Sequence, residues 1–180
     1  MVRVFRQGDM MKKLLLLATC LLMVSSAALA DHIGVYSDAT GSSCYLGAAG
    51  QFNPNATVIH KFTSGATGSR FKVTFPAGTA FFAFNTTYVP IGALDTDLSL
   101  GYGQCLSGEI VLGSILAIYG AGTGQVEKAD LQPIILYTNC VFAELLATGG
   151  AFTVGQAGYC TEYSTPVESS TWGSVKALYR

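Results

Sequence analysis

The sequence has few charged residues and almost no net charge. Ten Lys and Arg side chains stand against eleven Asp and Glu in 180 residues, which gives a formal net charge of −1. The chain has no basic excess to neutralise a phosphate backbone, and this argues against a nucleic-acid binder. Half of the residues are hydrophobic. A disordered chain is therefore also excluded, because it would need low hydrophobicity and a high net charge.

Residues that commonly carry catalysis are scarce as well. The chain has two histidines, His32 and His60, and neither has a second His or a carboxylate at metal-ligand spacing. It contains no H-E-x-x-H pair and no G-x-S-x-G turn, the patterns of zinc proteases and serine hydrolases. We therefore predict that the protein is not an enzyme and that it needs no cofactor.

The sequence has no apolar run long enough to cross a membrane. The run Leu14–Val24 has 11 residues, whereas a spanning helix needs roughly 20. Lys12 and Lys13 precede this run, and Ala28-Leu29-Ala30 follows it. A basic start, a short apolar stretch and a small-x-small ending are typical of a secretory signal peptide. We predict cleavage after Ala30, and hence an exported protein that is periplasmic, at the cell surface or extracellular, with no membrane span left.

Removal of residues 1–30 changes the composition. The remaining 150 residues hold six Lys and Arg against ten Asp and Glu, so the mature chain is mildly acidic. A chain of this length is typical of one domain. We divide the sequence into a signal peptide at 1–30, a β-sandwich domain at 31–164, and a linker with an amphipathic tail at 165–180.

Four cysteines remain after cleavage, and no two of them are spaced as C-x-x-C. An even number in an exported chain indicates two disulfides, and the spacing alone leaves three pairings open. We predict that Cys44 pairs with Cys160, joining the first and last strands, and that Cys105 pairs with Cys140.

Short strands separated by glycine and small polar residues fill the mature chain. The clearest is 70–75, where Phe71, Val73 and Phe75 alternate with polar residues, the period of a half-buried strand. The segment Glu109–Tyr119 indicates one bent strand or two short ones, and Val126–Gln132 predicts one helical turn. Further strands are expected at 33–36, 44–46, 56–62, 80–84, 133–137, 140–145, 152–154 and 158–163. This pattern predicts an all-β fold, an antiparallel, immunoglobulin-like β-sandwich with disulfides, and a small barrel is the alternative.

The last residues differ from the rest. Trp172, Val175, Leu178 and Tyr179 share one face if the tail is helical. Two interpretations stay open: a short helix that docks on the domain or frays, and a tag recognised by export or surface-attachment machinery.

Loop carboxylates are the remaining candidates for chemistry. Asp95 and Asp97 lie in an expected loop, but calcium takes six to eight oxygen ligands and two acids supply too few, so a solvated turn is favoured. With Glu109 the pair imitates the acid and nucleophile of a glycosidase. His32, next to the amine of Asp31 after cleavage, is a candidate copper or nickel ligand.

Two motifs resemble those of a known group of proteins. The segment Ile33–Cys44 reads I-G-V-Y-x-D-x-x-G-x-x-C, and Thr171–Arg180 reads T-W-G-x-V-K-x-L-Y-R. They are similar to motifs of small, uncharacterised, exported bacterial proteins. The resemblance implies export and a β-rich domain, and it brings no catalytic residue.

Three functions follow as hypotheses. The first is an exported, non-catalytic surface or envelope module that binds an unknown macromolecule or envelope component. The second is a small hydrolase or carbohydrate-active domain that uses Asp95, Asp97 or Glu109. The third is a periplasmic protein that binds a ligand or metal through His32, His60 or the Asp95–Asp97 pair.

Overall fold

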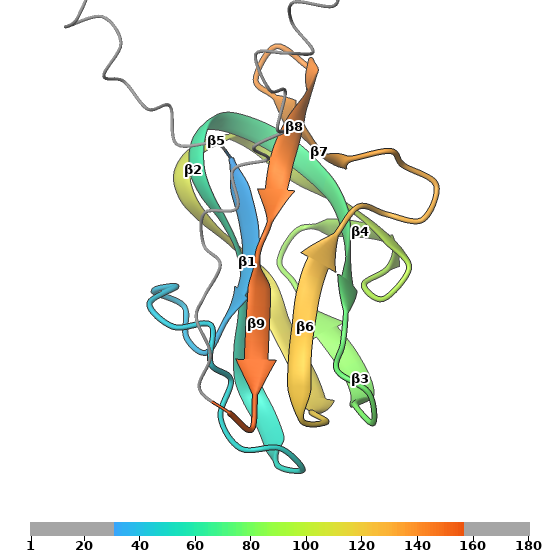
Figure 1. Ribbon diagram of the computed structural model, residues 1–180. Coiled ribbons are helices and arrows are strands. Elements are labelled where there is room, and N and C mark those ends of the chain that lie inside the picture. The colour runs from blue at the N-terminus through green and yellow to red at the C-terminus, as the bar shows by residue number, and fades with distance from the viewer. Residues whose placement is uncertain (1–30, 157–180) are drawn as a thin grey trace, which may run out of the picture.

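The computed structural model describes residues 31–156, which form nine strands and no helix (Figure 1). The strands are β1 (His32–Tyr36), β2 (Phe52–Thr74), β3 (Ala80–Asn85), β4 (Val89–Ala93), β5 (Asp97–Ile118), β6 (Gly122–Glu127), β7 (Ile135–Asn139), β8 (Glu144–Gly149) and β9 (Ala151–Val154). All neighbouring strands are antiparallel except β1 and β8. The predicted all-β, antiparallel, disulfide-bonded fold is confirmed.

Two long strands, β2 and β5, organise the fold. They have 23 and 22 residues and pair with each other from Phe52↔Ile118 to Phe71↔Leu98, with several register shifts between. The pair arches over the top of the molecule in Figure 1. In β2 the arch contains Gly65 with a φ of 154°, and in β5 it contains Gly103 and Gly108 with φ of 72° and 86°. Backbone of this kind favours glycine, which has no Cβ to clash.

The strand directions require that β2 turns back on itself. β1 is antiparallel to the first half of β2 and parallel to β8, whereas β7 is antiparallel to both β8 and the second half of β2. These directions agree only if β2 reverses between Lys61 and Ala66. One layer therefore holds β1, β3 and the adjoining halves of β2 and β5, and the other holds β8, β7, β4 and the remaining halves. β6 and β9 continue the second layer.

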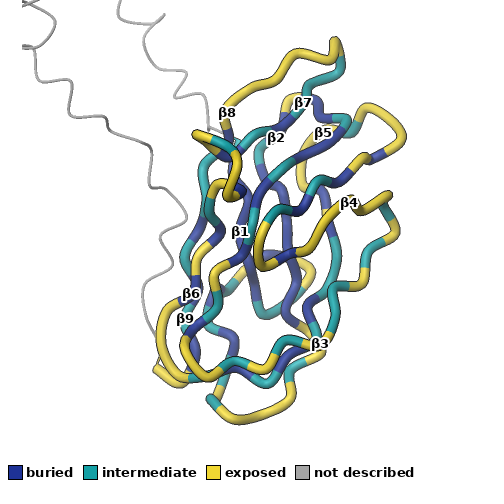
Figure 2. Tube along the Cα trace, turned by 90° about the vertical axis from the view of Figure 1, so that its right-hand side faces the viewer, coloured by how far each residue is buried: buried dark blue, intermediate teal, exposed yellow. Residues whose placement is uncertain are grey.

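The core lies between these layers and appears as the dark interior of the tube in Figure 2. Phe71 and Val73 from one end of β2 pack with Val58 from the other, and with Val35 and Leu112; each of these side chains is at most 1% exposed. The bend therefore lets one strand supply both sides of the core.

Several local predictions are wrong. The strands expected at 56–62 and 70–75 are parts of the single strand β2, because bulges carry the pairing with β5 through the segment between them. The helical turn expected over Val126–Gln132 is the end of β6 followed by a turn, since Val126 and Glu127 pair with Val73 and Lys72. The signal peptide, the strand at 158–163 and the tail lie outside the described residues. Among residues 31–156 there is no helix of the length and apolarity needed to cross a membrane.

The disulfide predicted between Cys105 and Cys140 is confirmed. It joins the arch of β5 to the hairpin between β7 and β8, with the two Cα atoms 5.3 Å apart. Gly65 packs directly beneath it, since a Cβ there would lie 2.6 Å from the Cys140 sulfur. Cys44 is also disulfide-bonded. Its expected partner, Cys160, lies outside the described residues, so that pairing stays a prediction.

Candidate functional site

The loop carboxylates lie at the turn between β4 and β5. Asp97 is held by Arg70, whose Nε donates to Oδ1 at 2.8 Å and whose Nη2 donates to Oδ2. These hydrogen bonds and the guanidinium charge lower the pKa of Asp97. Asp95 is exposed beside it. No group of three His, Cys, Asp or Glu side chains within residues 31–156 is arranged to hold a metal ion.

Glu109 lies on the same strand as Asp97, twelve residues further along. The arch of β5 lies between them, at Gly103 and Gly108. A glycosidase needs one carboxylate free to attack or to activate water and another free to donate a proton. Both oxygens of Asp97 are bonded by Arg70, so Asp97 is not free for either role.

We expect that Ca²⁺ does not raise the melting temperature of the protein, because Arg70 already occupies both oxygens of Asp97. A thermal unfolding series with increasing Ca²⁺ tests this. Arg70→Ala is the informative companion, since it frees the carboxylate while leaving Asp95 and Asp97 in place. A saturable rise in the melting temperature of the unmodified protein contradicts the expectation.

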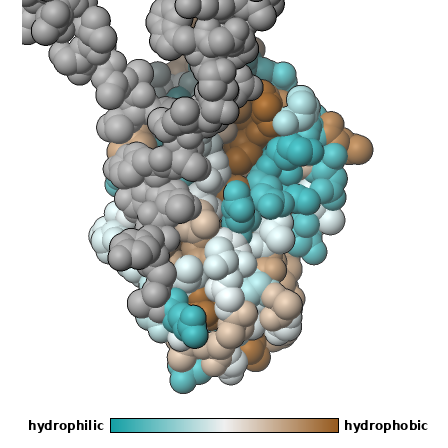
Figure 3. Space-filling model, viewed as in Figure 1, coloured by the Kyte–Doolittle hydropathy of each residue, from teal (hydrophilic) through white to brown (hydrophobic). Residues whose placement is uncertain are grey.

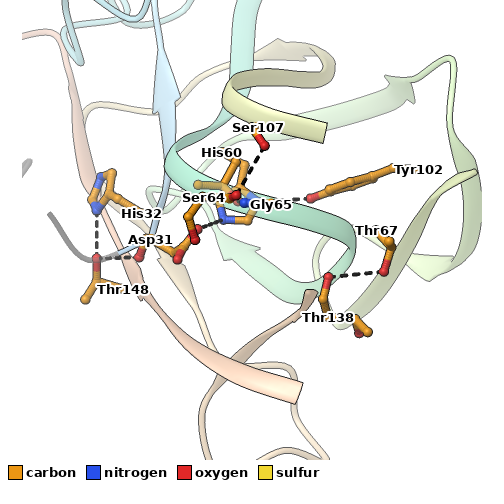
Figure 4. Close-up of polar contacts among 11 residues, drawn as sticks. Asp31, His32, His60, Ser64, Gly65, Thr67, Tyr102, Ser107, Thr138 and Thr148 are labelled. Carbon is orange, nitrogen blue, oxygen red and sulfur yellow. Dashed lines mark hydrogen bonds and ion pairs between the residues drawn. The ribbon is translucent and has the colours of Figure 1, made fainter. Parts of the chain in front are cut away.

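A buried polar group surrounds His60, and we call Asp31, His60, Tyr102 and Tyr137 the His60 cluster. His60 lies on β2 at the start of the arch and is fully buried. Its Nε2 lies 3.2 Å from Asp31 Oδ1, and its Nδ1 lies 3.2 Å from the Tyr102 hydroxyl on β5 (Figure 4). The Tyr137 ring on β7 packs edge-on at 5.5 Å between centroids, and its hydroxyl bonds Asp31. The cluster thus connects the start of the domain to three strands.

The protonation states in this cluster are set by burial and by the mutual contacts. Burial by itself raises the pKa of Asp31, but hydrogen bonds from His60 and Tyr137 and the charge of His60 outweigh it and lower that pKa. Burial also raises the pKa of Tyr102 above its usual range. Burial, followed by the hydrogen bond to Asp31, raises the pKa of Tyr137 to about 12. Asp31 is therefore an ionised acceptor, and both phenols keep their protons.

An Asp–His pair is the orienting half of a catalytic triad, but this one is closed to substrate. Tyr102 and Tyr137 are 5% exposed, and the larger cavities among the described residues are lined by other side chains. Asp31, Tyr102 and Tyr137 contact His60, and none of these three is a Ser or Cys nucleophile. The His60 cluster can stabilise the fold at the arch. Its arrangement does not support acyl or glycosyl transfer.

His32 is buried at the edge of β1. Its Nδ1 lies 3.0 Å from Thr148 Oγ1, and that hydroxyl donates to the Asp31 carbonyl at 3.2 Å. Because the hydroxyl has one proton, Nδ1 is the protonated ring nitrogen and Nε2 is the bare one. Nε2 faces Gly150, where a Cβ would approach it to 2.7 Å. Because both ring nitrogens are turned into the protein, His32 is not oriented to bind a metal at the N-terminus that cleavage after Ala30 would create.

The turn between β7 and β8, residues 140–143, is an exposed apolar turn that we call the hairpin tip. Val141 is 80% and Phe142 79% exposed. The Asn139 side-chain oxygen accepts hydrogen bonds from the backbone N–H of Val141 at 3.1 Å and of Ala143 at 2.9 Å. Phe142 has a φ of 62°, a conformation that non-glycine residues rarely adopt and that often marks functional loops. The disulfide of Cys140 fixes one end of the turn.

The sequence prediction of a strand over 140–145 is wrong, because β8 begins only at Glu144. Val141 and Phe142 are apolar, and apolar residues in such a pattern suggest a buried strand. This explains why a strand was predicted over 140–145. The available signal was Asn139, since an Asn side chain commonly bonds backbone two residues on and begins a turn.

A cavity of about 600 Å³ lies between β6 and β8. Ile134 and Leu146 give it apolar lining, and Lys72 and Lys128 lie on its rim. Figure 3 shows the corresponding apolar area beside β8, next to a hydrophilic area over the loop that follows β6. The volume falls within the range of small-ligand sites. Lys72, however, is engaged by Asp130 at 2.7 Å and by Glu127 at 3.8 Å, which leaves its charge neutralised by the protein itself.

Comparison with known proteins gives little. No family model matches the chain, and no curated protein matches it. Among solved structures, a chain from the crystal structure of the CaDoc0917–CaCohA2 complex at pH 5.5 is similar at 11% identity, with a TM-score of 0.47. The match covers 69% of this chain and 99% of that one. A likeness this distant carries no argument about function.

Proposed function

We propose that the protein is an exported, non-catalytic β-sandwich module that binds a protein partner through the hairpin tip. One observation carries the proposal: Val141 and Phe142 project about four-fifths exposed from a turn that a disulfide and two side-chain hydrogen bonds hold in place. Burial of a large apolar side chain stabilises a complex by about 1.5–3 kcal/mol. A turn that is already fixed loses little conformational entropy on binding. The partner that fits is a protein with an apolar cleft.

The residues considered for hydrolysis and for metal binding also favour a binding function. His60 is fully buried, and Asp97 is tied to Arg70. A hydrolase would need an accessible base and nucleophile side by side, and a calcium site would need free carboxylates. The described residues offer neither arrangement.

Export is supported by two independent features. The segment 1–30 has the charge and apolar pattern of a signal peptide. The folded domain contains a disulfide between Cys105 and Cys140, and such bonds persist mainly in oxidising compartments outside the cytosol.

The hairpin tip is tested by photo-crosslinking in the cells that produce the protein. A photoreactive phenylalanine analogue at position 142 is expected to give one discrete product of higher mass. The same analogue at Phe82 is the matched control, since Phe82 is 58% exposed on β3. No product at position 142, or the same product at both positions, argues against the proposal.

Binding by the tip also predicts a loss of affinity. The double substitution Val141→Ser and Phe142→Ser is expected to weaken binding of the cross-linked partner at least about tenfold, because two buried apolar contacts are removed. The melting temperature is expected to stay within error of the unmodified protein, since both side chains are exposed in the free domain.

A further inference from the structure

The outer face of the second layer carries two rows of side chains that run straight across five strands. The strand register aligns residues from β8, β7, β2, β5 and β4 in that order. The first row is Leu146, Leu136, Arg70, Ser99 and Ile91. The second row is Glu144, Thr138, Gly68, Gly101 and Val89.

The second row contains a hollow, because its two central positions are glycines. Gly68 and Gly101 pair on adjacent strands, and the open space over this part of the sheet has a volume of about 370 Å³. Strands lie about 4.8 Å apart, so the flanking strands β4 and β7 stand roughly 14 Å from each other. A Cβ at Gly101 would meet nothing within 4 Å, whereas one at the buried Gly68 would meet the Leu100 carbonyl oxygen at 2.7 Å. Both glycines line the groove, and its open space for a bulky side chain lies over Gly101.

The groove has apolar walls and charged ends. Val89 and Ile91, 66% and 70% exposed, form the wall on β4, which Figure 2 shows exposed along its length. Leu136 lines the opposite side. Arg70 lies in the neighbouring row and is paired with Asp97. Glu144 lies exposed at the β8 end, where its charge also acts on Arg70.

The open edge of β4 is a poorer docking place than the face. Pro90, in the middle of this strand, has no N–H to donate to an added strand. Proline at a sheet edge is one of the features by which proteins avoid further strand pairing. A segment that binds here must therefore lie on the side chains of the face.

We propose that this groove holds the chain's own C-terminal segment, with the indole of Trp172 in the hollow over Gly101. Trp172 is the only Trp of the chain, and its planar ring suits a hollow lined by two glycines. The guanidinium of Arg70 lies in the adjoining row, where it can stack on an indole.

Charge favours the same occupant. Residues 31–156 carry four basic and eight acidic side chains, whereas Trp172–Arg180 carries Lys176 and Arg180 and no acid. Lys176 follows Trp172 by four residues, about 13 Å in an extended chain. Glu144 lies two strands from Gly68 and three from Gly101, which is a comparable distance. With Trp172 in the hollow, a segment that runs towards β8 lets Lys176 reach Glu144.

The connection is long enough. Trp172 comes 16 residues after Gln156, the last described residue, and 12 residues after Cys160, the predicted partner of Cys44. Sixteen extended residues reach roughly 50 Å, and twelve reach roughly 40 Å. A tethered segment binds at an effective concentration in the millimolar range. A shallow groove of modest intrinsic affinity is therefore sufficient to hold it.

The single Trp makes the test specific. In the full chain the fluorescence of Trp172 is expected to be blue-shifted and shielded from acrylamide, compared with a free peptide of residues 165–180. Gly101→Leu fills the hollow without touching the core, and it is expected to move the emission and the quenching to those of the free peptide. Ala80→Leu adds the same bulk at an exposed position of β3 and is expected to change neither.

A charge exchange tests the second contact. Glu144→Lys is expected to increase acrylamide quenching of Trp172, and Lys176→Glu in the same chain is expected to restore the shielding in part. A merely structural role of Glu144 would not give this restoration.

Each other outcome overturns the proposal in a distinct way. Quenching of Trp172 in the unmodified chain equal to that of the peptide shows a free tail, as recognition by export or attachment machinery would need. Shielding that survives Gly101→Leu places the tail elsewhere. Shielding that disappears on dilution assigns the groove to the tail of a second copy. None of these results bears on the hairpin tip, which is tested separately.

Discussion

Replacement of both Cys105 and Cys140 by Ser is expected to lower the free energy of unfolding by about 4 kcal/mol. The bond closes a loop between residues 35 apart in sequence, and the chain-entropy relation gives about this value for a loop of that size. It also joins the arch of β5 to the hairpin tip, so its loss frees two segments that neighbouring strands hold only in part. Urea unfolding of the oxidised protein and of the double variant measures the difference.

The control for this experiment establishes which cysteines are paired in the unmodified protein. Non-reducing peptide mapping of the unmodified protein is expected to give a Cys105–Cys140 peptide and, by the sequence prediction, a Cys44–Cys160 peptide. A destabilisation below about 1 kcal/mol would show that the bond constrains the unfolded chain far less than its loop length implies. A peptide that links Cys44 to Cys105 would contradict both pairings.

Acidification from pH 7 to pH 4 is expected to remove about 3 kcal/mol of stability through His32 alone. Burial, followed by the charges of Lys61 and His60, lowers the pKa of His32 from 6.5 to about 4 in the folded protein. Below pH 6.5 His32 is protonated in the unfolded chain but stays neutral in the folded chain. The free energy of unfolding therefore falls as the pH falls. One pKa unit corresponds to about 1.4 kcal/mol. The loss is complete near pH 4.

His32→Asn is the matched variant, because an Asn amide can still donate to Thr148 and does not titrate. It is expected to flatten the decline of stability between pH 6.5 and pH 4, measured by urea unfolding at several pH values. Titration of Asp31 does not contribute to the change in stability between pH 6.5 and pH 4. Its pKa is lowered from 3.8, so the stability that it contributes is lost only below about pH 4. An identical slope in both proteins would show that His32 is not the group responsible.

The sequence predicted those parts of the fold that depend on the local alternation of apolar and polar residues. The alternation around Phe71 and Val73 fixed which face of that segment is buried, since side chains alternate across a strand. Both residues are in fact fully buried. The error lay in the ends of strands. Nothing local distinguishes a turn from a bulge through which a long strand continues, because the difference depends on whether β5 follows β2 around the arch.

The candidate sites show the same division. Residue type drew attention to Asp97, but its partner Arg70 lies 27 residues away in sequence and meets it through the pairing of β2 with β5. His60 looked like an isolated strand residue. Asp31, Tyr102 and Tyr137 surround it only because four distant segments converge at the arch.

By itself, the sequence determined the all-β class and the positions of most strands, because side-chain alternation is a local pattern. It left three cysteine pairings open, and the structure shows that Cys105 pairs with Cys140. Tertiary structure decided that two strands bend through both layers, that Asp97 is neutralised, and that Val141 and Phe142 face solvent. It also decided which glycines stand side by side to form a groove. Each of these depends on register between strands far apart in the chain, and register is set by the packing of the whole sandwich.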